Sequence, residues 1–590
     1  MTASMGSTDE TTADGGAQER AREAAAAAAA ETLLNCYMRE GGAWRPVPAG
    51  DVPDLAEEGD TYLAVMPFPS DRAMLLAGVR HLSPTHRHRF RLPVRLAIAG
   101  GSPWAVSLGT LAGMLVDELG DTGLGDLPTA AGSRGPDPTF LLARIRQSVA
   151  AVSSFLQARE GEIDALCSAE PLSFIASEQA SLLGDIAHPT TKSRWGMSPE
   201  QVEAYAPETA ARFVLRWLAV DPALVEHDSA TATSAPELTE QLLRDDPAVD
   251  AAALEAALEG LGERVLLPVH PWEIDHLRGQ ANVAALIDEG LVVDLGELGS
   301  AVTPTSSVRT VYNGDWPWQL TFSLHVQMTD AMPLARVHEL ERAVGVARQP
   351  DGEIGEQAAQ IAPQLVLLSD PAYLAVRHHG ALVDGLSVQL RENRWRSGSD
   401  ADVSAVGILA QDHPYGGASR LAQIVARLAT EAGHSEQEVA REWFARYCDV
   451  VVAPLVRLHR ELGLTIDSDQ QSMLLELEGG WPARGVLRDG HGCREPGTDA
   501  EAAIEALIPI AIINALGVAG LADELVLLGD LKALLERERE RERGGRCPTT
   551  LLDRLLDDPT WRCEANLRRR LQDSDDVFVT IANPLHGLDR

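Results

Sequence analysis

Two hydrophobic patterns alternate along this chain, and they limit its fold class more than any other feature. Short β-rich runs such as HRFRLPVRLAIAG (88–100) and RVLLPVHPW (264–272) lie among long helical runs such as TFLLARIRQSVAAVSSFLQARE (139–160). Strand-like segments crowd between residues 264 and 330, whereas the periodicity from residue 417 onward is mainly helical. The sequence contains no internal repeat. We therefore predict a mixed α/β (α+β) fold.

The strong negative charge of the chain indicates where it works. Its 590 residues include 87 acidic and 50 basic side chains, which give a formal net charge of -37, yet 45% are hydrophobic. Self-repulsion of this size is weak only where the Debye length is short, roughly 3 Å at 1 M salt. We therefore expect a halophilic protein with an acidic surface adapted to a cytoplasm of high salt. The same charge argues against nonspecific binding to nucleic acid.

The cysteines and the N-terminus both favour a cytoplasmic location. The six cysteines form no C-x-x-C pair and no cluster with histidines, so neither a zinc site nor a disulfide framework is predicted. The N-terminal segment is polar and acidic, unlike a signal peptide, and no uninterrupted apolar run reaches the roughly 18 residues of a membrane span. We expect a soluble protein with no membrane partner.

The N-terminal composition predicts a boundary between disorder and helix. Residues 1–18 are expected to form a disordered acidic tail because they are polar and have few apolar side chains. The alanine-rich run from Ala21 onward is a strong helix former. The first ordered element is therefore predicted to be a helix.

The segment HPTTKSRWG (188–196) holds Lys192, one of only two lysines in the chain, the other being Lys532. An ammonium, a guanidinium two residues later, two threonine hydroxyls and a histidine make a compact set of phosphate donors in a turn that contains proline. Short His-Pro turns are often no more than turns, so this segment carries little weight alone. Two further polar segments point to the same chemistry.

The segment TPTSSVRTVY (303–312) crowds hydroxyls and one guanidinium into a stretch of high β propensity after Pro304. The period of two places Ser307 and Arg309 on one face of a strand, with Thr310 opposite unless a bulge turns it. This set suits the binding of a triphosphate. An exposed strand with a polar face is the alternative interpretation.

The segment GLTIDSDQQSMLLELEGGWPARGVLRDGHG (463–492) is predicted to form two strands joined by a Glu-Gly-Gly turn. Asp467, Asp469 and Gln471 alternate on one side of the first strand, and Asp489 lies at the end of the second. Carboxylates that converge at the end of a hairpin suit Mg²⁺, which takes one or two carboxylates and completes its octahedron with phosphate oxygens and water. A solvated acidic strand is the competing explanation.

In this order and at these separations, the segments resemble one family, the siderophore synthetases of the aerobactin type (IucA/IucC). Members of this family carry H-P-x-x-K-x-R-x-G, H-P-W, S-x-R-T, an E-x-H-x-Q-N strand followed by R-D, K-A-L-L-x-M-R-L and N-P-L. The matching segments here are HPTTKSRWG (188–196), HPWE (270–273), SVRT (307–310), DSDQQS (467–472), RD (488–489), EANLRRRL (564–571) and NPL (583–585). The resemblance runs from about residue 170 to the C-terminus and depends on the ordered set.

The resemblance implies an ATP-dependent synthetase. In such enzymes a carboxylic acid, commonly citrate, is adenylated with release of pyrophosphate, and an amine or hydroxylamine-type nucleophile then displaces AMP. The implied architecture is a hand, with ATP between fingers and palm. Its parts are a thumb-like domain (19–200), a β-rich fingers-like domain (201–390) and a mainly helical palm-like domain (391–590). A homodimer, or an assembly with a second synthetase, is the implied oligomer.

Positions that match the motifs take the roles that the family implies. The expected phosphate-binding residues are His188, Thr190, Lys192, Arg194, Ser307, Arg309 and Thr310. Gln471 and Asp467 are expected to line the nucleotide, and Asp489 and Asp467 to bind Mg²⁺. The residues expected to take part in catalysis are Lys192, Arg309 and Asp489.

Several matched positions depart from the family. Thr321 stands where the family has a lysine, twelve residues after Arg309, and Pro333 stands where it has an arginine. Asp469 replaces a histidine, Ser472 an asparagine and Glu564 a second lysine. These changes remove cations from the acid side of the implied site, so we expect such a pocket to repel citrate.

Two explanations of these departures remain. The acid side is rebuilt, for a less charged acid or around other cations, the candidates being Arg336, Arg342, Arg568 and Arg570. Alternatively, adenylation is lost, and the chain acts as a nucleotide-binding or partner subunit of a true synthetase. The preserved phosphate donors favour an active enzyme.

Overall fold

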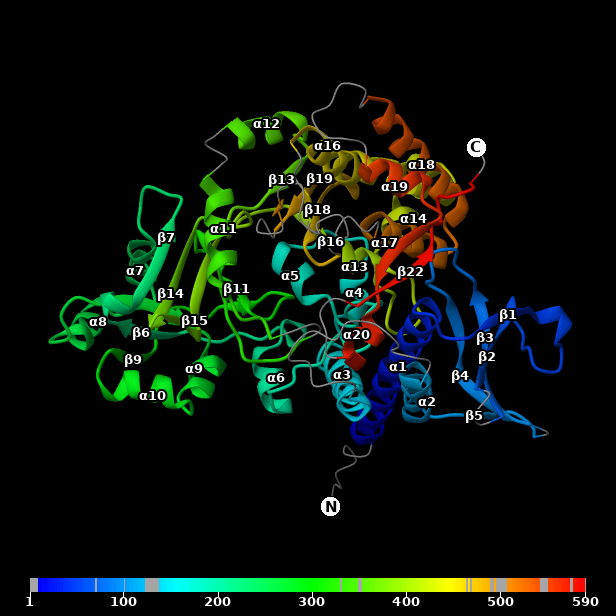
Figure 1. The fold of residues 1–590 in the computed structure, drawn as a ribbon, viewed down its shortest axis with the longest axis horizontal. Helices are drawn as coiled ribbons and strands as arrows, with labels where there is room; N and C mark the ends of the chain where they lie inside the picture. Colours follow the sequence, from blue (N-terminus) through cyan, green and yellow to red (C-terminus); the bar gives the residue numbers. More distant parts are fainter. Residues whose placement is uncertain are drawn as a thin grey trace, which may run out of the picture.

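The computed structural model has the predicted mixed architecture of helices and sheets (Figure 1). The residues that it describes are 9–68, 72–99, 101–121, 137–328, 332–348, 353–462, 465–466, 470–488, 493–494, 507–541, 550–572 and 577–588. Among them, no helix combines the length and the apolar character needed to cross a membrane.

The N-terminal part places a long helix beside a five-stranded antiparallel sheet. Helix α1 runs from Asp9 to Arg39, so it includes the second half of the segment that we expected to be disordered. The alanine run within it has high helix propensity. The sheet has the order β1 (Arg45–Pro48), β2 (Tyr62–Phe68), β3 (Ala73–His81), β4 (Arg89–Ile98), β5 (Trp104–Ala105). Helices α2 (Leu108–Asp121) and α3 (Pro138–Ala158) lie beside α1 (Figure 1).

Two antiparallel sheets form the middle of the chain and share one hydrophobic core. The larger has the order β10 (Thr303–Pro304), β11 (Thr310–Tyr312), β12 (Trp318–Phe322), β15 (Ala381–Glu392), β14 (Ala372–His378), β7 (Val225–Ser229). The smaller has the order β8 (Val265–Val269), β6 (Arg216–Val220), β9 (Val292–Glu297). The helices of this part are α7 (Ala235–Arg244), α8 (Ala251–Leu258), α9 (Pro271–Leu277), α10 (Ala281–Asp288) and α11 (Val337–Arg348). The strand-rich stretch predicted between residues 264 and 330 is confirmed.

The C-terminal part surrounds a four-stranded sheet with helices, as the helical periodicity predicts. The sheet order is β13 (Leu365–Leu367), β19 (Trp481–Leu487), β18 (Met473–Glu478), β16 (Asp402–Ala405), and only the β13–β19 pair is parallel. The helices are α12 (Glu353–Ile361), α13 (Val406–Ala410), α14 (Arg420–Ala432), α15 (Glu436–Tyr447), α16 (Ala453–Leu462), α17 (Leu507–Val518), α18 (Glu524–Arg541) and α19 (Thr550–Asp557). The predicted hairpin is β18–β19, and both glycines of its turn have positive φ, which suits residues without a Cβ.

The end of the chain returns to the N-terminal helix (Figure 1). Strands β21 (Thr560–Glu564) and β22 (Phe578–Ala582) form a hairpin that encloses α20 (Asn566–Gln572). The buried carboxylate of Glu40, at the end of α1, accepts the backbone N–H groups of Leu567 (2.9 Å) and Arg568 (2.8 Å). The hand-like division at residues 200 and 390 stays a prediction, and both this return and the β13–β19 pair cross it.

Three short helices lie near the Lys192 turn in the sequence: α4 (Ile163–Leu166), α5 (Phe174–Gln179) and α6 (Pro199–Tyr205). Helix α5 begins after Ser173, whose hydroxyl accepts the N–H of Ala176 (3.3 Å), a common N-cap arrangement. The Lys192 turn lies between α5 and α6 in the sequence.

Candidate functional site

The segment around Lys192 forms the predicted turn, and it is buried. The side chains of His188, Thr190, Lys192 and Arg194 belong to residues no more than 4% exposed. The backbone N–H of Lys192 donates to the hydroxyl of Ser148 on α3 (3.0 Å). Backbone hydrogen bonds of 3.0 and 2.9 Å join Trp195 to Gln327. The turn is therefore fixed between α3 and the segment that follows β12.

A buried carboxylate, Glu208, holds the two cations of this turn. Lys192 Nζ donates to Glu208 Oε1, and Arg194 Nη2 donates to the same oxygen at 3.3 Å. Burial alone would raise the pKa of Glu208, but the two neighbouring cations hold it below its usual value. The cluster keeps one net positive charge. In this structure Lys192 is thus an ion-pair partner inside the protein, whereas we expected an ammonium directed at a phosphate.

The Ser307 segment is a tight turn between β10 and β11, which corrects the prediction of one continuous strand. Val308 has φ +66°, and the N–H of Thr305 donates to the carbonyl of Thr310 (2.8 Å). The hydroxyl of Ser307 accepts the N–H of Thr310 (3.1 Å). Ser307 and Arg309 therefore lie in the turn itself, because the left-handed residue between them breaks the alternation of a strand.

The position of the missing family lysine lies opposite Thr310. Thr310 and Thr321 are register partners on β11 and β12, and their hydroxyl oxygens are 3.0 Å apart in a buried contact. A neutral hydroxyl pair therefore occupies the place where the family pattern has a cation.

The β18–β19 hairpin brings Gln471 to the Ser306 turn. Gln471 Nε2 donates to the hydroxyl of Ser306 (3.1 Å), so the second and third predicted segments meet. Asp467, Asp469 and Asp489 lie outside the described residues, and their predicted roles stay predictions.

Two residues that we did not single out as ligands, Glu178 and Arg488, complete this meeting point. Arg488 Nη1 donates to Glu178 Oε2 (2.7 Å), and Arg488 Nη2 donates to the hydroxyl of Ser306 (3.1 Å) and to the carbonyl of Gln471. Glu178 Oε2 also accepts the N–H (2.9 Å) and hydroxyl (2.8 Å) of Ser306. In so acidic a chain no local pattern distinguishes Glu178 or Glu208 from surface acids, and the only signal is their position beside the first motif.

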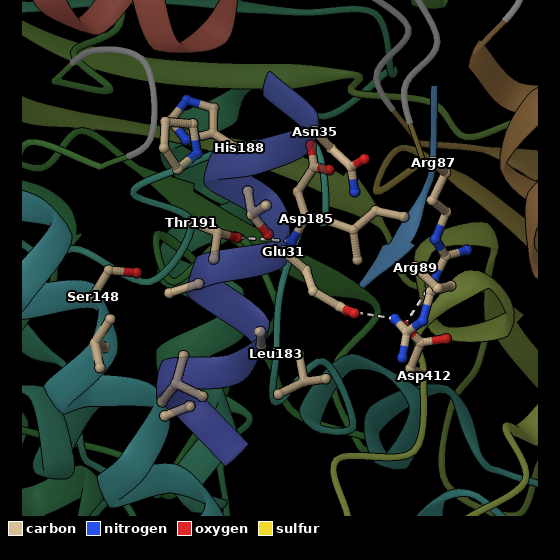
Figure 2. Close-up of a pocket in the computed structure, with 18 of the residues that line it drawn as sticks. Glu31, Asn35, Arg87, Arg89, Ser148, Leu183, Asp185, His188, Thr191 and Asp412 are labelled. Atoms are coloured by element: carbon tan, nitrogen blue, oxygen red, sulfur yellow. Dashed lines mark hydrogen bonds and ion pairs between the residues drawn. The ribbon is translucent and has the colours of Figure 1, made fainter. Parts of the chain in front are cut away.

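A polar pocket adjoins the Lys192 turn between α1 and the start of β4 (Figure 2). Arg89 Nη1 pairs with Glu31 (2.7 Å) and with Asp412 (2.6 Å), while Thr191 accepts the N–H of Asp185 (2.7 Å). Burial raises the pKa of Glu31, although Arg89 opposes this shift. The polar lining further includes Thr32, Asn35, Arg87, Ser148 and His188. The pocket offers charges of both signs to a small polar group.

The C-terminal motif reaches the same turn. Asn566 Nδ2 donates to the carbonyl of Ala187, directly before His188 (2.8 Å). Glu564, at the position of a family lysine, pairs with Arg569 (3.2 Å). The NPL motif has a structural role, because Asn583 Nδ2 donates to the carbonyls of Leu555 (3.0 Å) and Asp558 (2.7 Å).

The arginines considered as replacement cations lie in different surroundings. Arg336 and Arg342 are exposed. Arg568 Nε donates to the carbonyl of Glu40 (2.9 Å). The side chain of Arg570 lies outside the described residues. Pro333, at the position of a family arginine, accepts the N–H of Leu324 through its carbonyl (3.2 Å).

Comparison with known proteins identifies the family of this chain. The family model described as the IucA / IucC family matches residues 173–410, and a model described as a ferric iron reductase FhuF-like transporter matches residues 441–509. The rhizobactin siderophore biosynthesis protein RhbC of Rhizobium meliloti is 32% identical over 95% of this chain and 97% of its own. The spermidine-citrate ligase of Bacillus anthracis is 27% identical over 96% of this chain and 98% of its own.

Solved structures show the same fold. The ATP-bound aerobactin synthetase IucA from Klebsiella pneumoniae superposes with a TM-score of 0.82 at 27% identity, covering 95% of this chain and 99% of that one. The fold and the meeting of the motif segments define the class as that of the siderophore synthetases, which are ligases. The chain belongs to the IucA/IucC family.

Proposed function

We propose that this chain is an ATP-dependent synthetase that adenylates citrate or a related carboxylic acid and condenses it with an amine or hydroxylamine-type nucleophile. The observation that supports this most is the cluster of Ser306, Gln471 and Arg488, because it joins two segments to which the family resemblance assigns nucleotide binding. The aerobactin synthetase of similar fold is described as ATP-bound, and relatives are named as ligases of citrate.

The proposed reaction has two steps. A carboxylate oxygen of the acid attacks the α-phosphorus of ATP, and the bond to pyrophosphate breaks. The nucleophile then attacks the acyl carbon and loses a proton, and AMP leaves with the electron pair of the broken acyl–oxygen bond. Both steps move negative charge onto phosphate oxygens, so fixed donors and cations near them lower the barriers.

The chain's own residues would orient the triphosphate. Ser307, Arg309 and Thr310 lie in and after one tight turn, where hydroxyls, a guanidinium and backbone N–H groups are close together. The Lys192–Arg194–Glu208 cluster would add one net positive charge from behind the turn that carries it. Lys192 would then act over a distance, unless nucleotide binding draws it away from Glu208.

We propose Mg²⁺ as the metal, bound by Asp489 and Asp467. The ion supplies charge neutralisation on the phosphates when bound. Arg488, the residue before Asp489, is anchored in the cluster with Gln471, which fits a metal site at this edge of the hairpin. The described part of the chain has no group of three or more His, Cys, Asp or Glu side chains arranged for a metal.

We propose a cytoplasmic, halophilic enzyme that works as a homodimer or with a second synthetase. On the acid side, Thr321 places a neutral hydroxyl where the family pattern has a lysine, which favours an acid held by hydrogen bonds more than by cations.

A second candidate follows from the replaced positions. Thr321 and Pro333 stand where the family pattern has cations, so a chain that binds nucleotide without adenylating an acid is the alternative. Such a chain would serve as the partner of a second, motif-complete synthetase.

The test is pyrophosphate release in about 2 M KCl with ATP, Mg²⁺, a panel of di- and tricarboxylates and hydroxylamine as a generic trap. Release that depends on one acid and disappears in Lys192→Ala and Asp489→Ala supports the synthetase. ATP binding without release across the whole panel supports the partner subunit.

A further inference from the structure

Glu178 is a buried acid that no motif role explains. It lies on α5, is 1% exposed, and is ten residues before His188 in the sequence. Its Oε2 accepts three hydrogen bonds, two from Ser306 (2.9 and 2.8 Å) and one from Arg488 (2.7 Å). Burying a carboxylate is costly unless it is paired and hydrogen-bonded, and these contacts meet that condition for one oxygen.

The contacts of Glu178 span three distant parts of the chain. Ser306 lies in the β10–β11 turn, beside Ser307 and Arg309, and Arg488 directly follows strand β19. The hydroxyl of Ser306 donates to Glu178 and accepts from Arg488 (3.1 Å) and Gln471 (3.1 Å). One hydroxyl therefore uses its donor and both lone pairs in a single closed network.

The same short helix also approaches the first motif. The hydroxyl of Ser181, two residues after the end of α5, accepts a hydrogen bond from Lys192 Nζ (3.4 Å). The N–H of Ala180 donates to the carbonyl of Ser177 (3.0 Å), and this hydrogen bond fixes the backbone at the end of α5. Glu178 is therefore placed where a movement of α5 would reach all three predicted nucleotide segments.

We propose that Glu178 is a positioning residue that fixes the Ser306–Thr310 turn relative to the hairpin that carries Gln471 and Arg488. This inference rests on the proposed nucleotide site. Glu178 does not touch the nucleotide; it fixes Ser306 and Arg488, and they fix the neighbouring residues that do. Its carboxylate charge is required because Arg488 is 5% exposed and has no other acid among the ion pairs found in the described residues.

The alternative is that Glu178 only stabilises the fold, and the two roles differ in what they change. A structural acid lowers stability when neutralised but leaves the affinity of the folded protein for ATP unchanged. A positioning acid changes affinity and turnover in the folded fraction. Misplacing a bound group by about 1 Å can cost on the order of 100-fold in rate.

The experiment compares Glu178→Gln with Glu538→Gln in the full chain in about 2 M KCl. Glu538 is a matched control, because it is also a buried acid (2% exposed) bound by arginines, Arg457 (2.8 Å) and Arg460 (3.1 Å), but it lies on α18 and pairs with α16. The readouts are the Kd of ATP with Mg²⁺, the KM for ATP, kcat and the thermal midpoint. Ser306→Ala is measured alone and in combination with each variant. If Glu178→Gln does not fold, Ser306→Ala tests the inference in its place.

We expect Glu178→Gln to raise the ATP Kd about 10- to 100-fold, and Glu538→Gln to lower only the thermal midpoint. The Ser306→Ala effect on Kd should be non-additive with Glu178→Gln and additive with Glu538→Gln. Folded Glu178→Gln, or Ser306→Ala, with a Kd within twofold of wild type overturns the inference. Because Kd is measured without acid, a chain that binds ATP but makes no product still tests Glu178, whereas absence of ATP binding in the wild type overturns both proposals.

Discussion

Thr310 and Thr321 face each other on neighbouring strands with their hydroxyl oxygens 3.0 Å apart. Thr321 occupies the position at which the family pattern has a lysine, and both residues are buried. The pair keeps β11 and β12 in register without a charge. This neutral contact makes the substitution part of a well-formed structure, which favours a rebuilt site over a decayed one.

The Thr310–Thr321 contact predicts a difference between two small substitutions. Thr321→Val keeps the shape but leaves the hydroxyl of Thr310 without this partner, so we expect a loss of about 1–3 kcal/mol in the free energy of unfolding. Thr321→Ser keeps the hydroxyl and should lose less. Urea unfolding in about 2 M KCl measures both. Equal stability of the Val and Ser variants would contradict a structural role for this hydrogen bond.

The Glu208 cluster predicts an unusual order of stabilities. Glu208→Gln leaves Lys192 and Arg194 as two buried cations without their acid, and breaking such a pair costs about 3–5 kcal/mol. Lys192→Met leaves the Arg194–Glu208 pair and should cost less. Adding Lys192→Met to Glu208→Gln removes one unpaired cation, so we expect the double variant to be more stable than Glu208→Gln alone. A double variant less stable than both single variants, measured by the same unfolding, contradicts this cluster.

His325 predicts a pH dependence near neutrality. Its ring Nδ1 lies 2.5 Å from the buried carboxylate of Glu273, and this hydrogen bond raises the pKa of His325 above its usual 6.5. Because the folded pKa is the higher one, the stabilisation is fully present below pH 6.5 and is lost as the pH rises through the folded value. The free energy of unfolding should therefore fall more steeply above pH 6.5 in the wild type than in His325→Gln. Parallel pH profiles for the two proteins would show that the pair contributes nothing.

The net charge of -37 predicts stabilisation by salt. Raising KCl from about 0.1 M to about 1 M shortens the Debye length from about 10 Å to about 3 Å, so the thermal midpoint should rise mainly within this range. A rise that continues in proportion to salt beyond about 1 M indicates general exclusion of salt from the surface instead. A midpoint that does not change would contradict the halophilic interpretation.

The sequence predicted the fold class and several elements because their signals are local. Period-two and helical patterns identified β4, the strands between residues 264 and 330 and the β18–β19 hairpin. Helix α1 begins before the predicted boundary at residue 18, because the composition of residues 1–18 is typical of disorder, whereas the alanine run that follows favours a helix. The Ser307 turn was mistaken for a strand because the left-handed φ of Val308 has no signal in a β-branched residue.

The site was predicted only in part because its organising contacts are not local. Motif order identified Ser306 to Thr310 and Gln471 as neighbours in function, and the structure brings Ser306 and Gln471 into contact. Glu178 pairs with Arg488, 310 positions away in the sequence, and the cations paired with Glu208 are at most 16 positions away. In so acidic a chain, the sequence does not show that either acid is buried. These two acids are identified only in the structure, where each one pairs with buried cations.

Transfer of oxygen from the acid to the nucleotide distinguishes an acyl adenylate from other activated forms of the acid. The wild-type protein is incubated with ATP, Mg²⁺, hydroxylamine and the productive acid labelled with ¹⁸O in its carboxylates, and the nucleotide products are analysed by mass spectrometry. We predict AMP that carries one ¹⁸O, because the attacking carboxylate oxygen remains on the α-phosphate when the nucleophile displaces AMP from the acyl group. Formation of ADP together with ¹⁸O-labelled inorganic phosphate would contradict the account.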